Sequence, residues 1–246
     1  MKKTILLVAL CLCVGNIFAQ DADKLRDEGD AALKAKDYAT AVTKYSEYLK
    51  TNDKDTVRIF NAGFAANQAK NYTEAAKFFG KAIEMKYNVD DSYVGAAMAY
   101  RNLKKTDEFI NTVKAGLKEI PDGNKNKNNL EKLLYAYCIK NGQLLNKKGD
   151  ADGAEKLFKE VLNVSNKAYK ANALYSLGAM LYGNGAKILT AATPKATSEP
   201  DAYKAEKAKA DKLFTSAKDY LTQALGLNPN SEGSKKILES INQILK

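Results

Sequence analysis

Thr56 to Val89 reads TVRIFNAGFAANQAKNYTEAAKFFGKAIEMKYNV, and the segments on either side repeat its pattern of small and large apolar residues at a spacing of 34 residues. Such self-similarity predicts a repeat protein in which each unit is a pair of antiparallel helices. Each pair has an apolar flank that only its neighbour can cover, so we expect a stack with a groove and not a globule with a pocket. Four registers carry the repeat: Gly29, Gly63 and Ala97; Ala41, Ala75 and Phe109; Tyr45, Phe79 and Val113; Tyr48, Ala82 and Gly116.

Within one unit, the apolar spacing is that of two amphipathic helices. Ile59 and Gly63 are four residues apart and share a face of the first helix, while Phe79 lies on the apolar face of the second. Where two helices cross closely only a small side chain fits, and an aromatic ring fills the wider space beyond the crossing. Asn71 followed by Glu74 has the spacing of a capping box at the start of the second helix.

These residues resemble the tetratricopeptide repeat family, whose consensus has small residues at positions 8, 20 and 27, aromatics at 11, 17 and 24, and often Pro at 32. Position 8 is small in all three units, and Pro121 stands at position 32 of the third. The chain departs from the consensus in having Tyr48 at a small position and no Trp at position 4. The resemblance implies an all-α fold, a right-handed superhelical solenoid of about five antiparallel helix pairs with a C-terminal capping helix.

We expect one solenoid domain over residues 20–246. Its fourth unit has a lengthened first helix, and its fifth contains a flexible loop at residues 190–202, which includes two prolines. Gly183-Asn184-Gly185 is predicted to end a helix. The expected units cover residues 22–55, 56–89, 90–123, 124–168 and 171–229, followed by the capping helix at 231–246.

The first nineteen residues have the features of a cleaved signal peptide. Lys2 and Lys3 give a positive start, residues 4–14 are mostly apolar, and Ala19 before Gln20 suits the cleavage site. A membrane span needs roughly 20 apolar residues, and this run is shorter. We therefore expect an exported bacterial protein, in the periplasm or secreted, with no membrane span.

Without that leader the chain has 37 basic and 29 acidic residues, a net charge of +8. This charge favours anionic partners but does not choose between a lipopolysaccharide, an acidic glycan and an acidic protein tail. Nucleic acid is disfavoured because of the export signal and the lack of a recognition motif.

Catalysis is not expected. The chain contains no histidine, and Cys138 is the one cysteine left after the leader, predicted to be a buried apolar residue. A catalytic thiol usually needs a histidine partner, and no Gly-rich phosphate loop is present. The sequence therefore predicts neither an enzyme nor a cofactor nor a metal site.

The resemblance also implies a binding face. In tetratricopeptide stacks, positions 2, 5, 9, 12 and 13 of each unit tend to point into the groove. Carried over, these positions give Arg26, Asp30, Lys34, Phe60, Phe64, Asn67, Gln68, Val94, Met98, Arg101, Asn102, Ile139, Gln143, Asn146, Tyr175 and Tyr182. The alternative for the aromatic and Met residues is ordinary packing between helices.

Some relatives hold a C-terminal carboxylate with a clamp of Lys, Arg and Asn side chains. At the corresponding positions this chain has Arg26, Asp30, Asn61, Asp91 and Gly95. Only Arg26 and Asn61 could serve, and the two aspartates would repel the ligand. The sequence therefore predicts no carboxylate clamp.

Two functions remain. The first is a protein-interaction scaffold of the bacterial envelope that binds an extended peptide or a partner helix. Its predicted peptide-binding residues are Phe60, Asn61, Phe64, Asn67, Gln68, Val94, Met98, Arg101, Asn102, Ile139, Gln143 and Tyr175. The second is charge-driven binding of an anionic envelope polymer, which rests on the net charge and on Tyr175 and Tyr182.

Overall fold

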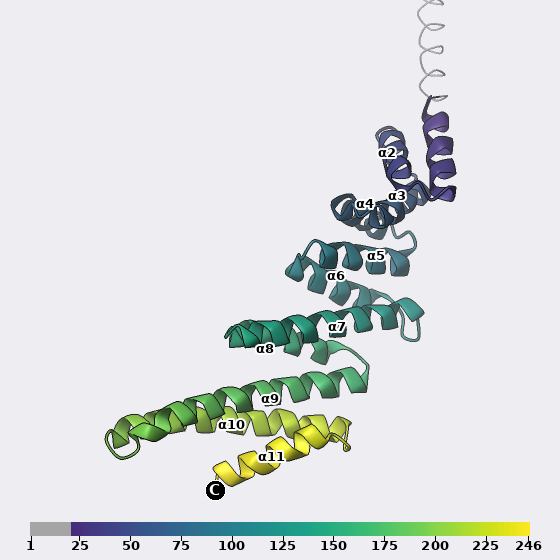
Figure 1. Cartoon of the computed structure of the whole chain (residues 1–246). Coiled ribbons are helices and arrows are strands. Elements are labelled where there is room, and N and C mark those ends of the chain that lie inside the picture. Colours follow the sequence, from purple (N-terminus) through teal and green to yellow (C-terminus); the bar gives the residue numbers. More distant parts are fainter. Residues whose placement is uncertain (1–20) are drawn as a thin grey trace, which may run out of the picture. The chain divides into compact units, whose positions relative to one another are not determined.

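The computed structural model describes residues 21–246, and every regular element among them is a helix (Figure 1). The predicted all-α class is thus confirmed. None of the helices in this range combines the length and apolar character that a membrane span requires. The predicted signal peptide, residues 1–19, lies outside the described residues.

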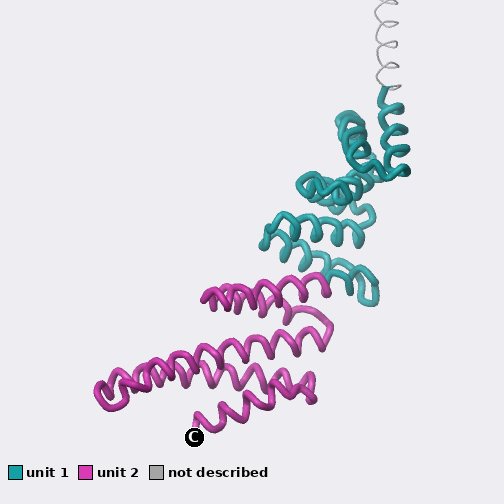
Figure 2. The backbone as a smooth tube through the Cα atoms, viewed as in Figure 1, with its two compact units in different colours: residues 1–130 teal, residues 131–246 magenta. Residues whose placement is uncertain are grey.

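The chain divides into two compact units, residues 1–130 and 131–246 (Figure 2). In unit 1 each helix packs against the next, and the first helices α3 and α5 also pack on each other. This is the predicted arrangement of paired helices that cover one another's apolar flanks. The helices of unit 1 are residues 21–34, α2 (Tyr38–Tyr48), α3 (Thr56–Gln68), α4 (Tyr72–Glu84), α5 (Val89–Asn102) and α6 (Thr106–Glu119).

Unit 2 continues the paired pattern, and it contains the longest helices of the described residues. The division at residue 130 falls inside α7 (Lys125–Lys147). Then come α8 (Ala151–Glu160), a 3-10 turn at Val161–Asn163, α9 (Lys167–Ala192), α10 (Pro200–Leu227) and α11 (Glu232–Ile244). The single domain expected over residues 20–246 stays a prediction.

Side-chain caps fix where several helices begin. The Asp37 carboxylate accepts a hydrogen bond from the Thr40 N–H at 3.2 Å, and Asp150 accepts one from the Gly153 N–H at 2.9 Å. The Asn71 side chain accepts from the Glu74 N–H at 3.4 Å, which is one half of the predicted capping box, while the Asn71 N–H donates to the Ala66 carbonyl. Each cap satisfies one of the N–H groups that a helix start leaves without an intrahelical partner.

Close helix crossings depend on glycines that lie under large rings. A Cβ added at Gly63 would lie 3.1 Å from the ring of Phe79, and one at Gly95 would lie 2.5 Å from the same ring. Phe79 is almost fully buried, so a single ring from α4 fills the space beside both α3 and α5. In unit 2 the ring of Phe158 covers Gly142 in the same way.

The loop predicted at residues 190–202 is shorter in the structure. The helix end predicted at residues 183–185 is wrong. Helix α9 continues through both glycines to Ala192, and a 3-10 turn, Thr193–Lys195, follows. Gly185 packs under the ring of Phe214 on α10, so helix contact outweighs the cost of about 1 kcal/mol for a glycine in a helix. Pro200 begins α10, where its missing N–H breaks no intrahelical bond.

The predicted capping helix is confirmed. Helix α11 packs on α9 and α10, and Ile241 is fully buried in the same apolar cluster as Leu221 and Phe214. Its Ser231 cap accepts a hydrogen bond from the Ser234 N–H. Helix α11 therefore covers the apolar flank that α9 and α10 leave open.

Candidate interaction surface

Unit 1 exposes large apolar side chains on α3 and α5. Val57, Phe64 and Met98 are 37%, 41% and 39% exposed, and together they form what we call the apolar stripe. Phe64 and Met98 are 34 residues apart and so occupy the same place in successive first helices. The ring of Tyr38 meets Phe64 edge to face at a centroid distance of 6.2 Å. Grouped apolar side chains on the surface are typical of interaction sites.

Phe60, in contrast, is part of the helix packing. Its ring is partly buried and meets Phe79 and Tyr87 edge to face, with centroid distances of 5.6 and 6.0 Å. Val94 on α5 is also half-buried. The structure therefore separates the predicted apolar residues into two groups, and only Phe64 and Met98 are well exposed.

Several predicted polar residues bond to the chain's own backbone. The Asn67 amide donates to the Gly95 carbonyl at 3.0 Å, which joins α3 to α5, and Asn102 donates to the Met98 carbonyl at 2.8 Å. Asn61, also on α3, is half-buried. Gln68 is exposed beside the apolar stripe, so its amide is available to a ligand.

Asp30 lies in a network of charged and aromatic groups. It accepts hydrogen bonds from the Tyr45 hydroxyl at 2.8 Å and from the guanidinium of Arg58. Burial alone would raise the pKa of Asp30, but the bonds from Arg58 and Tyr45 outweigh it and hold that pKa below its ordinary value. Asp30 therefore stays charged at neutral pH and joins the first helix to α2 and α3.

Arg26, the one cation at a clamp position, has acidic partners on its own helix. It pairs with Asp23 at 2.7 Å and with Asp27 at 2.8 Å. Its charge is therefore offset within its own helix, and the absence of a carboxylate clamp stays a prediction.

In unit 2 the structure brings some predicted residues together and separates others. Gln143, Asn146 and Tyr175 line one hollow of about 410 Å³, whose floor includes Phe158 and Met180. Ile139 is partly buried against the core. The ring of Tyr182 packs on Phe214 at 5.8 Å, so Tyr182 belongs to the helix packing.

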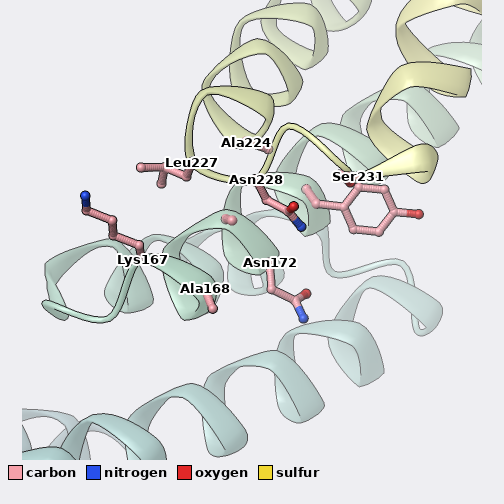
Figure 3. A pocket seen from close by; sticks show the side chains of 9 residues that line it. Lys167, Ala168, Asn172, Ala224, Leu227, Asn228 and Ser231 are labelled. Carbon is pink, nitrogen blue, oxygen red and sulfur yellow. The ribbon is translucent and has the colours of Figure 1, made fainter.

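A second hollow of unit 2, of about 620 Å³, lies where α9, α10 and the start of α11 meet (Figure 3). Leu227 and Asn228 at the end of α10 lie across it from Ala168 and Asn172 of α9. Tyr175 lines this hollow as well as the smaller one. No sequence pattern pointed to it, because it is formed by three helices whose meeting depends on tertiary packing.

Val57 is the stripe residue that the sequence interpretation missed. It lies at position 2 of its unit, one of the five groove positions, so the position rule could have found it. Tyr38 was also missed, since it lies on a second helix and reaches Phe64 only in the folded unit.

Cys138 is fully buried, as predicted. Burial, together with the nearby charge of Glu160, raises the pKa of the Cys138 thiol to about 12. The thiol is thus protonated at neutral pH and is a poor nucleophile. Among residues 21–246 no three His, Cys, Asp or Glu side chains are grouped so that they could hold a metal ion.

The comparisons with known proteins establish the family. No family model matches the chain. The chain is similar to the crystal structure of a TPR repeats protein from Bacteroides fragilis, with 42% identity, a TM-score of 0.78, and coverage of 91% of this chain and 98% of that one. A tetratricopeptide repeat protein from Parabacteroides merdae matches at 16% identity and a TM-score of 0.42, over 91% of this chain and 99% of that one. The TPR2AB domain of yeast Sti1, in a complex with pHSP90, matches at 18% identity and a TM-score of 0.37, over 92% of this chain and 98% of that one. On the first of these matches, the chain belongs to the tetratricopeptide repeat family.

Proposed function

We propose that this protein is a non-catalytic interaction scaffold that binds an extended peptide or a helix of a partner protein across the apolar stripe of unit 1. The observation that carries the proposal is the exposure of Phe64 and Met98 at the same place in α3 and α5. A ligand that crosses both helices would cover both side chains. The exposed Gln68 amide would hydrogen bond to the ligand's backbone.

The apolar stripe is large enough to anchor a ligand of modest affinity. Burial of the exposed part of one such side chain contributes about 2 kcal/mol at 25 cal/mol per Å². Part of this gain offsets the entropy that the ligand loses on binding. Helix packing fixes the spacing between Phe64 and Met98, so the surface is pre-organised for the ligand.

The location of the scaffold is part of the proposal. The positively charged, apolar start of the sequence supports export, and so a partner in the bacterial envelope or outside the cell. The partner is a protein or a peptide. The proposal includes no cofactor.

A second candidate function, binding of an anionic envelope polymer, is favoured by the distribution of charge. Residues 131–246 include 18 basic and 12 acidic residues, a net charge of +6. Residues 21–130 include 19 basic and 17 acidic residues, a net charge of +2. The excess of positive charge is therefore larger in unit 2 than in unit 1, which carries the apolar stripe. Electrostatic attraction of a polymer would act mainly on unit 2.

The test uses the chain from Gln20 to Lys246. Proteins captured from an envelope extract are identified by mass spectrometry, and peptides that tile the captured partner are measured by fluorescence anisotropy. We expect Phe64→Asp to weaken peptide binding at least tenfold, because it places a charge where an apolar contact forms.

Leu144→Asp is the matched control, because Leu144 is also an exposed apolar residue but lies in unit 2. Circular dichroism checks that both variants are folded. Equal peptide affinity of Phe64→Asp and the unaltered chain would remove the apolar stripe from consideration.

A further inference from the structure

A hollow on a different side of α3 has the features of a separate docking site. It has a volume of about 460 Å³ and lies between α2, α3 and α4. Its apolar lining is narrow: Leu49 and Phe78 are 8% and 6% exposed, and Ile59 is fully buried. Ile59 and Phe64 are five residues apart, which is roughly 140° around the helix, so this hollow and the apolar stripe face different directions.

The rim of the hollow is basic. Lys50, Lys77 and Lys81 line it, and Glu74 is its one acidic residue. The Lys77 ammonium lies 3.6 Å from Glu74, and Lys81 lies 3.8 Å from the exposed Asp53. Surface pairs of this length contribute little to stability, so they compete only weakly with a ligand's carboxylates.

One lysine also contacts the apolar lining. The Lys77 ammonium lies over the ring of Phe78, 5.7 Å from its centroid. A cation held above an aromatic ring places positive charge next to an apolar surface. The hollow therefore suits a ligand that carries an apolar group beside a negative one.

The basic rim is not a consequence of the repeat. The residues 34 positions after Lys50, Lys77 and Lys81 are Glu84, Asn111 and Ala115. The next unit thus keeps the helix pattern without the three lysines. Helix packing alone does not require lysine at these places.

We propose that this hollow binds an acidic segment of a partner protein, with one apolar side chain against Leu49 and Phe78 and flanking carboxylates on the three lysines. This site is separate from the apolar stripe and does not depend on it. A chain with both sites would hold two partners at once.

The experiment is an NMR titration of the ¹⁵N-labelled chain from Gln20 to Lys246. The probe is a capped five-residue peptide with a phenylalanine between two pairs of glutamates. We expect the amide signals of Leu49, Ile59 and Phe78 to shift in a saturable way. A peptide with alanine in place of the phenylalanine, and another with lysines in place of the glutamates, should bind at least tenfold more weakly.

Variants of the rim test the role of charge. Combined Lys50→Ala, Lys77→Ala and Lys81→Ala should weaken binding about tenfold, since three weak ion pairs together are worth about 1.4 kcal/mol. The corresponding triple arginine variant should bind within about threefold of the unaltered chain. Phe64→Asp should have no effect, which keeps this proposal distinct from the stripe.

Three outcomes would overturn the proposal. The first is unchanged affinity in the triple alanine variant. The second is equal binding of the alanine-containing peptide, which would indicate plain charge attraction of any polyanion. The third is a set of shifted signals confined to other parts of the chain.

Discussion

Single residues decide how closely the helices of unit 1 approach. Phe79 fills the space next to Gly63 and Gly95, and an added methyl group would meet its ring at either position. Gly80, one residue further along α4, has nothing within 4 Å of the place where its Cβ would be. Adding a Cβ should therefore destabilise the chain at Gly63 or Gly95 and stabilise it at Gly80.

We predict that Gly95→Ala lowers the free energy of unfolding by about 1–3 kcal/mol, because the buried Phe79 ring must move. Gly80→Ala should raise it by about 0.5–1 kcal/mol, since alanine favours the helix and meets no neighbour. Urea unfolding followed by circular dichroism measures both. A stabilised Gly95→Ala variant would contradict the packing described for Phe79.

Asp30 gives a prediction about pH. The pKa of Asp30 is held below its ordinary value in the folded chain. The stability that the Asp30 carboxylate contributes is therefore fully present above its pKa in the unfolded chain, and it is lost as pH falls through its pKa in the folded chain. Asp30→Asn should cost about 1 kcal/mol at pH 7, a value reduced by solvent screening because the side chain is 37% exposed.

The difference between Asp30→Asn and the unaltered chain should shrink below about pH 4 and vanish once the carboxylate is protonated in both folded and unfolded chains. Urea unfolding at a series of pH values measures it. Asp21→Asn, at an exposed position, is the control. A difference that is constant with pH would show that the charge of Asp30 has no role.

Among the helices, α11 has the clearest separate task. It brings one fully buried residue, Ile241, to the cluster that contains Phe214 and Leu221, while much of its surface is exposed. A stack of helix pairs ends in an apolar flank, and a terminal helix with one polar face makes that end soluble. Helix α11 has both an apolar face, which packs on the cluster, and an exposed face.

Ile241→Ala should destabilise unit 2 by about 2–5 kcal/mol, the range for a fully buried isoleucine. Gln243→Ala, on the exposed side of the same helix, should change stability by no more than about 0.5 kcal/mol. Hydrogen exchange read by mass spectrometry should show faster exchange in α10 and α11 of the first variant. Unchanged protection there would mean that α11 is not a cap.

For the whole molecule, the response to salt separates the two candidate functions. Binding of an anionic polymer to the basic residues of unit 2 should weaken steeply between about 50 and 500 mM salt, where the Debye length falls from about 14 to 4 Å. Peptide binding through Phe64 and Met98 should change little, because apolar burial is not screened. Affinity measured across this range for polyglutamate and for a captured peptide decides between them.

The residue patterns of the sequence were enough to determine the repeat, the helix pairs and the capping helix, because small residues, aromatics and caps act through local spacing. The resemblance to the tetratricopeptide family, carried over by position, predicted the stripe residues Phe64 and Met98. It did not separate them from Phe60, since exposure depends on which neighbouring helix covers each side chain.

Only the tertiary structure decided three further points. Helix α9 runs through Gly183 and Gly185 because α10 packs on it, which outweighs the local preference of glycine for a turn. Asn67 and Asn102 bond to backbone carbonyls within the fold, which reduces what they offer a ligand. The lysine-rimmed hollow is formed by side chains from three helices, and contacts between such distant residues are not encoded in the period of 34 residues.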